Sequence, residues 1–266
     1  KTLTARLVAK CVDVQFSRIQ FTPDLMPSDV LGTSIYNPNE SRFEFKRGPI
    51  FSNIVLIDEI NRAPAKTQAA LFEIMEERQV TMDGQTYTME PPFMVIATQN
   101  PIEYEGTYRL PEAQLDRFLF KINVPYPNEE QEFKILSRFH ELGNQQIFQN
   151  IQAVLTAQQI KEVRQLVKGI IIEDQLLQYI AKIIVTTRSH KSIFLGASTR
   201  ASLAIMNAAK AIAGMSGRDF VTPEDVVYVT PYVLRHRILL TPEKEMEGIS
   251  TDDVIQQVIH AIEIPR

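Results

Sequence analysis

The sequence has few of the features that mark several common classes of protein. It holds one cysteine, Cys11, which excludes an internal disulfide and is typical of a reducing compartment. No apolar run approaches the roughly 18 residues that a membrane-spanning helix requires. The formal net charge is −4, so no overall positive charge favours nucleic acid. We therefore expect a cytoplasmic protein that does not insert into membranes.

Motifs for zinc binding and for serine-type nucleophilic catalysis are also missing. The histidines show no paired spacing typical of a zinc site, and no Ser/His/Asp arrangement with a nucleophile elbow is present. The histidines are His140, His190, His236 and His260. What is present is a composition of 44% hydrophobic and 23% charged residues over 266 positions, which is typical of a folded globular chain.

Two aliphatic runs predict buried parallel strands. Residues 54–57 and 93–97 are continuous apolar runs without alternation, as expected when helices cover both faces of a sheet. Each run ends abruptly in polar residues, Asp58-Glu59 after the first and Thr98-Gln99-Asn100 after the second. A third candidate strand, 16–21, ends in a turn signal. Ligands of open α/β sheets bind at the carboxyl ends of the strands, so these polar groups are expected to share one site.

Further patterns divide the chain into two parts. A helical pattern over 66–78 precedes a hairpin centred on Asp83-Gly84, the strongest short-range signal for a two-residue turn. The pattern changes near Pro125-Tyr126-Pro127, after which every element is predicted to be helical. The predicted helices are 129–142, 156–168, 173–188, 198–214, 222–234 and 250–262. We expect an α/β domain over 1–127 and an all-helical domain over 128–266.

The adjacent acids Asp58 and Glu59 are the sharpest chemical feature. Phosphoryl transfer from a nucleotide needs a magnesium ion, which prefers carboxylate and water oxygens. It also needs a second carboxylate that positions and polarises the attacking water. Asp58 could serve the metal and Glu59 the water. The alternative reading is an acidic, solvated start of a loop.

Lys1-Thr2 and Asn100 fit the same chemistry less specifically. Lys-Thr is consistent with the end of a phosphate-binding loop, whose glycines would precede it, or with a solvated terminus. Asn100 could hold a water or contact a terminal phosphate without adding negative charge, although Asn-Pro is also a common turn. The order of these features along the chain, together with Asp58-Glu59, is the order that a P-loop ATPase shows.

Two arginines could stabilise charge on a transferring phosphoryl group. Arg117 ends a short predicted helix, where a surface pair with Asp116 or Glu112 is the alternative. Arg200 lies in the first turn of the helix that begins near Ser198, where the helix dipole disfavours a cation. We therefore expect an anionic partner for Arg200.

Taken together, these motifs resemble the MoxR family of AAA+ ATPases from end to end. The blocks that carry the resemblance are Phe45–Phe51, Ile57–Pro64, Ala97–Pro101, Glu105–Tyr108, Leu110–Phe118, Gly196–Ser202 and Val221–Val226. The resemblance implies a P-loop core with a parallel sheet flanked by helices, followed by a helical lid. It also implies a helix-2 insert over about 23–45 and a hairpin over 79–92 before the sensor 1 residue. Thr199 departs from the family, since many relatives carry proline before the lid arginine.

The resemblance also implies roles for individual residues. Lys1 would contact the β- and γ-phosphates of ATP, and Thr2 with Asp58 would hold Mg²⁺. Glu59 completes Walker B, and Asn100 corresponds to sensor 1. The arginine finger, which acts on the neighbouring subunit's nucleotide, corresponds to Arg117, and the sensor 2 arginine of the lid to Arg200.

An arginine that acts between subunits implies a ring, which we expect to be a hexamer. Its implied function is chaperone-like remodelling or maturation of client protein complexes, with a von Willebrand A-type domain protein as partner. A nucleic-acid motor is an alternative, but the acidic balance and the absence of Lys and Arg from 80–87 argue against it. The other alternative is a scaffold that binds nucleotide without hydrolysis. The presence of all five candidate residues argues against that scaffold, which would not need them: Asp58, Glu59, Asn100, Arg117 and Arg200.

Overall fold

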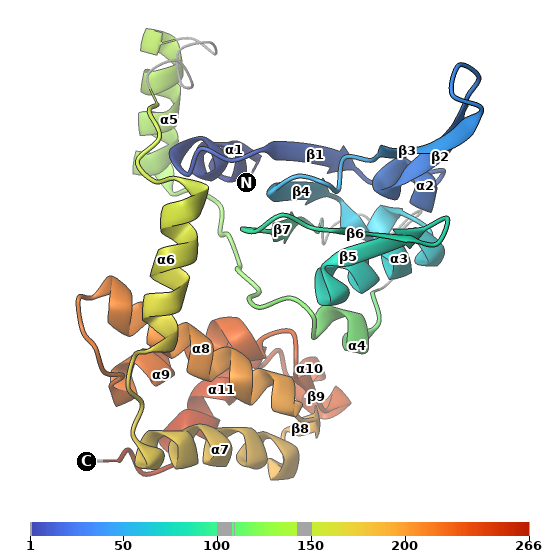
Figure 1. Cartoon of the computed structure of the whole chain (residues 1–266). Helices are drawn as coiled ribbons and strands as arrows, with labels where there is room; N and C mark the ends of the chain where they lie inside the picture. Colours follow the sequence, from blue (N-terminus) through green and yellow to red (C-terminus); the bar gives the residue numbers. More distant parts are fainter. Residues whose placement is uncertain (1, 100–107, 109, 143–150, 266) are drawn as a thin grey trace. The chain divides into compact units, whose positions relative to one another are not determined.

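A computed structural model describes residues 2–99, 108, 110–142 and 151–265 (Figure 1). The chain forms two compact units that interleave along the sequence. The first comprises Lys1–Leu110 and Pro125–Glu162, and the second comprises Pro111–Val124 and Val163–Arg266. The domain boundary near residue 127 remains a prediction. No helix among the described residues has the length and apolar content needed to cross a membrane.

The first unit is built on a parallel sheet. Its described strands are β1 (Phe16–Gln20), β4 (Ile54–Asp58) and β7 (Met94–Ala97), in the order β1-β4-β7. Every residue of β4 is buried, as expected from its continuous aliphatic sequence. In the register, Gln20 pairs with Asp58 and Ile57 pairs with Ala97, so all three strands end together. The predicted fold class, a parallel sheet in an α/β core, is confirmed.

Helices and two hairpins accompany this sheet. The helices are α1 (Thr2–Cys11), which contacts β4, α2 (Pro27–Leu31), the short 3-10 helix η1 (Ile60–Arg62) and α3 (Ala65–Glu77). The hairpins are β2 (Gly32–Asn37) with β3 (Arg42–Arg47), and β5 (Gln79–Met82) with β6 (Gln85–Thr88). The second hairpin turns at Asp83 and Gly84, both with positive φ, as Asp-Gly predicts.

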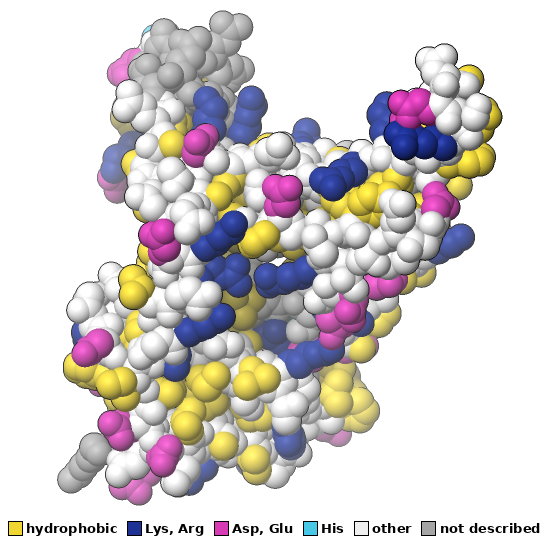
Figure 2. Space-filling view, in the orientation of Figure 1, with side chains coloured by type: hydrophobic (Ala, Val, Ile, Leu, Met, Phe, Trp, Pro, Cys, Tyr) yellow, Lys and Arg dark blue, Asp and Glu magenta, His cyan; other side chains and the backbone are white. Residues whose placement is uncertain are grey.

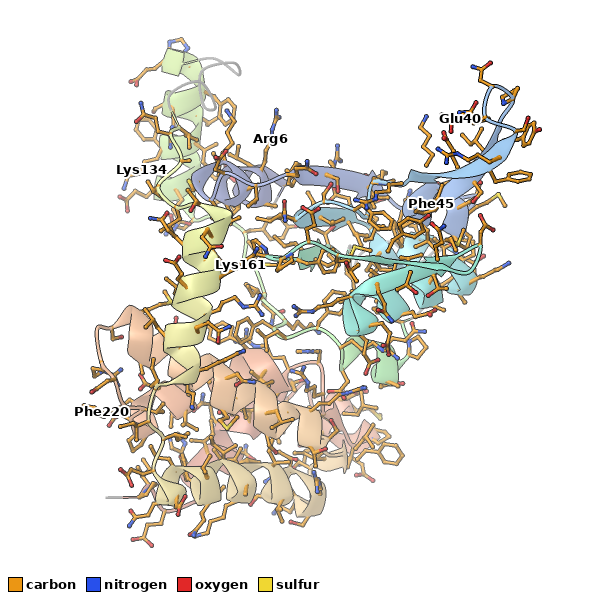
Figure 3. All side chains as sticks on the ribbon, in the orientation of Figure 1. Arg6, Glu40, Phe45, Lys134, Lys161 and Phe220 are labelled. Atoms are coloured by element: carbon orange, nitrogen blue, oxygen red, sulfur yellow. The ribbon has the colours of Figure 1, made fainter. Side chains whose placement is uncertain are left out.

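An aromatic cluster joins the two hairpins. The Phe45 ring lies 4.6 Å from the Tyr87 ring and 5.8 Å from the Phe51 ring, measured between centroids. The Arg47 guanidinium lies over the rings of Phe51 and Tyr87, at 5.3 and 5.9 Å from their centroids. Figure 3 shows Phe45 at the base of the β2–β3 hairpin and Glu40 at its far end. Basic and apolar side chains lie side by side on this hairpin (Figure 2).

Two longer helices follow the sheet. α5 (Glu129–Leu142) belongs to the first unit, and α6 (Ala157–Lys168) runs from the first unit into the second. Their bounds agree closely with the predicted helices at 129–142 and 156–168.

The second unit is mostly helical, as predicted. Its helices are α4 (Glu112–Leu115), α7 (Asp174–Ser189), α8 (Thr199–Met215), α9 (Pro223–Leu234), α10 (Pro242–Met246) and α11 (Thr251–His260). It also contains a short antiparallel pair that the sequence did not predict, β8 (Ile193–Leu195) with β9 (Leu239–Leu240). These strands are only 3 and 2 residues long, too short for a hydrophobic period to be visible.

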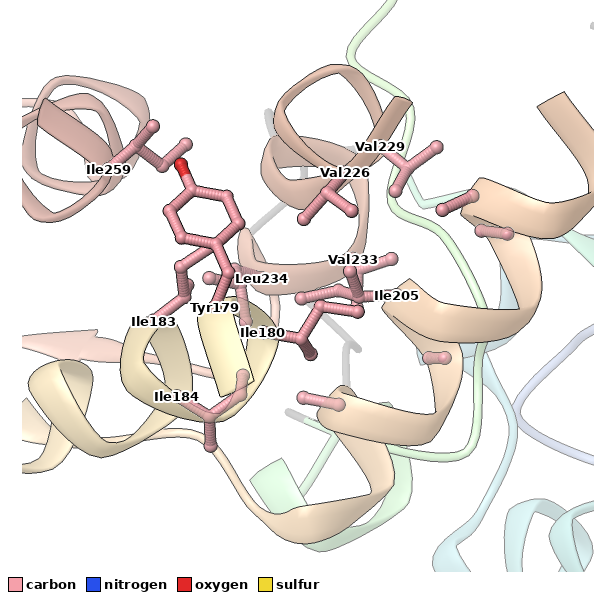
Figure 4. Packing of buried hydrophobic residues seen from close by; sticks show 14 of the residues in the cluster. Tyr179, Ile180, Ile183, Ile184, Ile205, Val226, Val229, Val233, Leu234 and Ile259 are labelled. Atoms are coloured by element: carbon pink, nitrogen blue, oxygen red, sulfur yellow. The ribbon is translucent and has the colours of Figure 1, made fainter. Parts of the chain in front are cut away.

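Helices α7, α8, α9 and α11 enclose the core of the second unit (Figure 4). Ile183 of α7, Ile205 of α8, Val233 of α9 and Ile255 of α11 are each 0% exposed. Burying such a side chain stabilises a fold by about 1.5–3 kcal/mol. Burial of these side chains therefore stabilises the packing of the four helices against one another.

Candidate active site

The ends of three parallel strands bring polar side chains together in the first unit. β4 ends at Asp58, β7 is followed by Thr98, and β1 ends at Gln20. Backbone hydrogen bonds also join β4 and β7 where the two strands end. Thr98 N donates to Ile57 O, and Ile60 N donates to Thr98 O. The predicted convergence of the two strand ends is therefore present.

Asp58 is largely buried, and each of its carboxylate oxygens accepts one hydrogen bond. The Nε atom of Arg18 lies 2.6 Å from its Oδ2, and the Thr98 hydroxyl donates to its Oδ1 at 3.2 Å. The Asp58 side chain is 11% exposed and that of Arg18 is 53% exposed. The ion pair thus joins a largely buried carboxylate to a half-exposed arginine.

Glu59 turns the chain immediately after β4. Its backbone is left-handed, with φ 58° and ψ 51°, a conformation that is costly for a residue with a side chain. Its amide donates to Thr98 Oγ1 at 3.0 Å. Its carboxylate oxygen Oε2 accepts a hydrogen bond from Gln20 Nε2 at 2.9 Å and lies 3.2 Å from Arg62 Nε. The Glu59 carboxylate is therefore held beside, but separate from, that of Asp58.

The chemistry of these groups fits a magnesium–nucleotide complex. A carboxylate offers about four lone-pair positions, and the hydrogen bonds from Arg18 and Thr98 use two of those on Asp58. The carboxylate and the Thr98 hydroxyl are hard oxygen donors of the kind Mg²⁺ prefers. Magnesium commonly binds through one or two carboxylates together with water and substrate phosphates, so a large protein ligand set is not required.

The other predicted residues of the phosphate site are only partly described. Lys1 and Asn100 lie outside the described residues. Thr2 is the first residue of α1 and is half-buried. Their predicted roles remain predictions.

Arg200 lies in the second unit, at the start of α8. Ser198 caps this helix, with its hydroxyl accepting from Arg200 N at 3.2 Å. The Arg200 guanidinium lies 3.9 Å from Asp116 Oδ2, and its side chain is 50% exposed. The predicted anionic partner is therefore Asp116. The same Oδ2 atom accepts a hydrogen bond from the Ser198 hydroxyl at 2.9 Å.

Arg117 follows α4 in the same unit and is half-buried. The residue before it, Asp116, forms a second and closer ion pair with Arg237, whose Nε lies 2.7 Å from Asp116 Oδ1. The Arg237 side chain is 3% exposed. Burial, as the largest cause, lowers the pKa of Arg237, and the hydrogen bond to Asp116 opposes that shift.

His236 reinforces the same segment. Its Nε2 donates to Phe118 O at 2.9 Å. Burial lowers the pKa of His236 to about 4, assisted by the neighbouring charges of Arg237 and Lys121 and opposed by the bond to Phe118 and by Asp116. The imidazole is therefore neutral near pH 7.

Sequence reasoning missed Arg18 and Gln20 in the first unit, and the roles of His236 and Arg237 in the second. It named Thr98 only as part of the polar end of a strand, and Asp116 only as an alternative partner of Arg117. A signal existed for Arg18 and Gln20, because both are polar residues near the end of a strand predicted to lie in the sheet. Arg237 gave no local signal. Its partner Asp116 lies 121 positions away in the sequence, and only the fold brings them together.

Comparison with known proteins gives family matches to both units. A model described as "ATPase family associated with various cellular activities (AAA)" matches residues 1–120, and an AAA lid domain model matches residues 185–258.

Individual relatives match over the whole chain. The chain is 46% identical to the uncharacterized protein YeaC of Bacillus subtilis, across 100% of this chain and 82% of that protein. It is 43% identical to the chaperone MoxR1 of Mycobacterium tuberculosis, across 100% of this chain and 72% of that protein. Among solved structures, a candidate ATPase from Cytophaga hutchinsonii superposes with a TM-score of 0.92 at 43% identity, across 100% of this chain and 82% of that one.

Proposed function

Since the chain belongs to the MoxR family of AAA ATPases and is itself an ATPase, we propose that it couples magnesium-dependent ATP hydrolysis to chaperone-like remodelling or maturation of partner protein complexes. The observation that carries the proposal is the junction of Asp58, Glu59 and Thr98 at the ends of β4 and β7. Two carboxylates that are fixed by different partners can take different roles in one reaction.

Asp58 and Glu59 have different roles in the proposed hydrolysis. Asp58, with Thr2, would hold magnesium, which supplies neutralisation of phosphate charge when it is bound. Glu59 accepts a proton from the attacking water and orients that water towards the γ-phosphate. Gln20 and Arg62 hold the Glu59 carboxylate in one place, so little reorganisation is needed when the water loses its proton.

The phosphate contacts come from residues that the family resemblance assigns. Lys1 binds the β- and γ-phosphates, and Asn100 holds the γ-phosphate or the water. The two arginines of the second unit stabilise the charge that develops during transfer. We assign Arg200 to the nucleotide of its own subunit and Arg117 to that of the neighbouring subunit, which requires a ring, most simply a hexamer.

The partners we propose are proteins. The relative MoxR1 is named a chaperone, which supports a client protein. The von Willebrand A-type partner and the cytoplasmic location are proposed from the family resemblance alone. The β5–β6 hairpin carries no lysine or arginine over its strands, so it offers no cation for a nucleic-acid phosphate.

The test is steady-state ATP hydrolysis with and without magnesium, together with Glu59→Gln. We expect turnover that requires the metal. Glu59→Gln should bind ATP but turn over at least ~10²-fold more slowly, because loss of a general base typically costs this much. Glu73→Gln, an exposed acid of α3, is the matched control and should keep the wild-type rate. Turnover of the Glu59 variant within a few-fold of wild type would remove Glu59 from this role.

A further inference from the structure

Arg237 holds the backbone on both sides of Arg117. Its Nη2 atom donates to the carbonyl oxygen of Asp116 at 2.9 Å and to that of Phe118 at 2.6 Å. Arg117 stands between these two residues. Its backbone is therefore fixed at both neighbours by one side chain.

Every N–H donor of the Arg237 guanidinium has an acceptor. Within the described part of the chain, Arg237 also donates from Nε to Asp116 Oδ1 at 2.7 Å, and from Nη1 to Leu119 O at 3.1 Å and Val233 O at 2.6 Å. A guanidinium has five N–H donors, and these contacts account for all of them. Val233 belongs to α9, so the clamp joins the segment around Arg117 to the buried core of the second unit.

Neighbouring contacts extend the same attachment. His236 Nε2 donates to Phe118 O at 2.9 Å, and Lys121 N donates to Tyr232 O at 2.9 Å. The segment 116–121 is thus bonded along the end of α9 at several points. A buried charge with every donor satisfied is well suited to holding one geometry, whereas an incompletely satisfied one would be costly.

We propose that Arg237 is a positioning residue for Arg117. It binds the backbone on either side of Arg117 to the helical unit, so that the Arg117 guanidinium contacts the nucleotide of the neighbouring subunit. The inference rests on the proposed role of Arg117 in that subunit's site. Arg237 itself contacts neither nucleotide nor Mg²⁺ in this assignment. Replacing Arg237 should therefore change the rate of hydrolysis and not ATP binding. The change should occur at the site that receives Arg117 from the altered subunit.

The first test is Arg237→Lys, which keeps a positive charge near Asp116 and loses the fork that binds the carbonyls. We expect kcat to fall about 10- to 100-fold, the cost of a small misplacement of a catalytic group. The Kd for ATP should stay within about twofold, because an interaction made only in the transition state does not alter ground-state binding. Asp116→Asn, which leaves Arg237 its four carbonyl acceptors, should give a smaller loss.

Arg218→Lys is the matched control. Arg218 also forms a close ion pair in the second unit, with Asp225 at 2.6 Å, and donates to a backbone carbonyl, that of Phe220. Its hydrogen bonds and ion pair within the described part of the chain go to Phe220 and Asp225, not to residues 116–119. Equal kcat values for the lysine variants at 218 and 237 would overturn the inference.

Subunit mixing separates positioning from general damage. Arg237→Lys subunits keep an intact Glu59, and Glu59→Gln subunits keep an intact Arg117. Adding Glu59→Gln subunits should therefore restore turnover at Arg237→Lys sites to the same extent as at Arg117→Ala sites. If Glu59→Gln subunits restore turnover with Arg117→Ala but not with Arg237→Lys, this inference is overturned and the proposed function is unaffected. Absence of turnover in wild type, or failure to rescue Arg117→Ala, would overturn the assignment of Arg117 and the inference with it.

Discussion

The backbone amide of Glu59 donates a hydrogen bond to the side-chain oxygen of Thr98 at 3.0 Å. This bond joins the ends of β4 and β7 at a residue whose backbone is left-handed, with φ 58°. Such a conformation costs on the order of 1 kcal/mol or more and persists only when the surroundings enforce it. Because the Thr98 hydroxyl also donates to Asp58, one hydroxyl fixes both acids of the candidate site.

Thr98→Val should therefore lower both turnover and stability. The change keeps the shape of the side chain but removes the acceptor for Glu59 N and the donor to Asp58. We expect a loss of about 2 kcal/mol in the free energy of unfolding, because two hydrogen bonds are removed and each usually contributes about 1 kcal/mol. Turnover should fall on the order of 10-fold or more as the acids lose their alignment. Urea unfolding and steady-state kinetics measure the two effects.

Thr86→Val is the control for this change. Thr86 is an exposed threonine of β6 whose hydroxyl pairs only with Thr81 in the described structure. It should change neither the rate nor the free energy of unfolding appreciably. A Thr98→Val enzyme with wild-type turnover would show that the hydroxyl does not align the acids.

The parts of this site that could be predicted are those that follow strand order. Asp58 and Glu59 were predictable because a polar pair after a buried strand must lie at the carboxyl edge of the sheet. The bond from Arg18 to Asp58 was not, because it depends on the register of β1 against β4. Register is set by packing over the whole sheet, and a one-residue slip would turn Arg18 to the other face.

Tyr87→Leu should loosen the link between the two hairpins of the first unit. The ring of Tyr87 contacts that of Phe45 and lies beneath the guanidinium of Arg47. Loss of one aromatic pair and one cation–π contact should cost about 1–2 kcal/mol in the free energy of unfolding. Amide hydrogen exchange of β3 should accelerate, which mass spectrometry can measure.

Phe43→Leu provides the comparison within the same hairpin. Phe43 is 69% exposed and forms an aromatic pair with Tyr36, at 5.3 Å between ring centroids. This pair lies within the β2–β3 hairpin and does not involve β5 or β6. Equal exchange rates in the Tyr87 and Phe43 variants would contradict a specific link between the hairpins.

The long helices of the second unit could be predicted from the sequence, but the segments that pack against them could not. Thr222-Pro223-Glu224-Asp225 predicted the start of α9, and Thr222 and Asp225 do form a capping box there. The grouping of residues 111–124 with this unit was not predictable, because it depends on contacts such as Arg237 with Asp116, 121 positions apart. Periodicity reports which face of an element is buried, but not which partner covers it.

Arg117→Ala should abolish the dependence of specific activity on protein concentration. If Arg117 acts on the nucleotide of a neighbouring subunit, the wild-type rate per subunit rises with concentration as subunits assemble. Loss of an arginine finger costs about 10³-fold or more in kcat, so the variant should be slow at every concentration. ATPase assays across the assembly range, with sedimentation on the same samples, measure both quantities.

Arg138→Ala, an exposed arginine of α5, is the control for a general loss of positive charge. It should follow the wild-type curve. A rate that is independent of concentration, and equal in wild type and Arg117→Ala, would defeat the assignment of Arg117 to a neighbouring site.

His236 predicts how the stability of the second unit depends on pH. Burial lowers its pKa from the ordinary 6.5 to about 4, so the unfolded chain binds a proton between these values and the folded chain does not. Stability is therefore complete above pH 6.5 and falls as the pH drops from 6.5 towards 4. The full difference is about 3 kcal/mol, at about 1.4 kcal/mol for each unit of pKa shift. Burial is the largest single influence on the pKa of Asp225 and raises it, but Arg218 and the Thr222 amide together lower it, so Asp225 loses its contribution at a lower pH.

His236→Gln separates the imidazole from the carboxylates. A glutamine amide can still donate to Phe118 O but does not titrate, so the free energy of unfolding should become nearly flat between pH 6.5 and 4.5. His260→Gln, at an exposed position on α11, should keep the wild-type slope. Urea unfolding at pH 7, 6, 5 and 4.5 distinguishes them. An unchanged slope in the His236 variant would mean that burial, together with the charges of Arg237 and Lys121, does not keep this imidazole neutral against the opposing charge of Asp116.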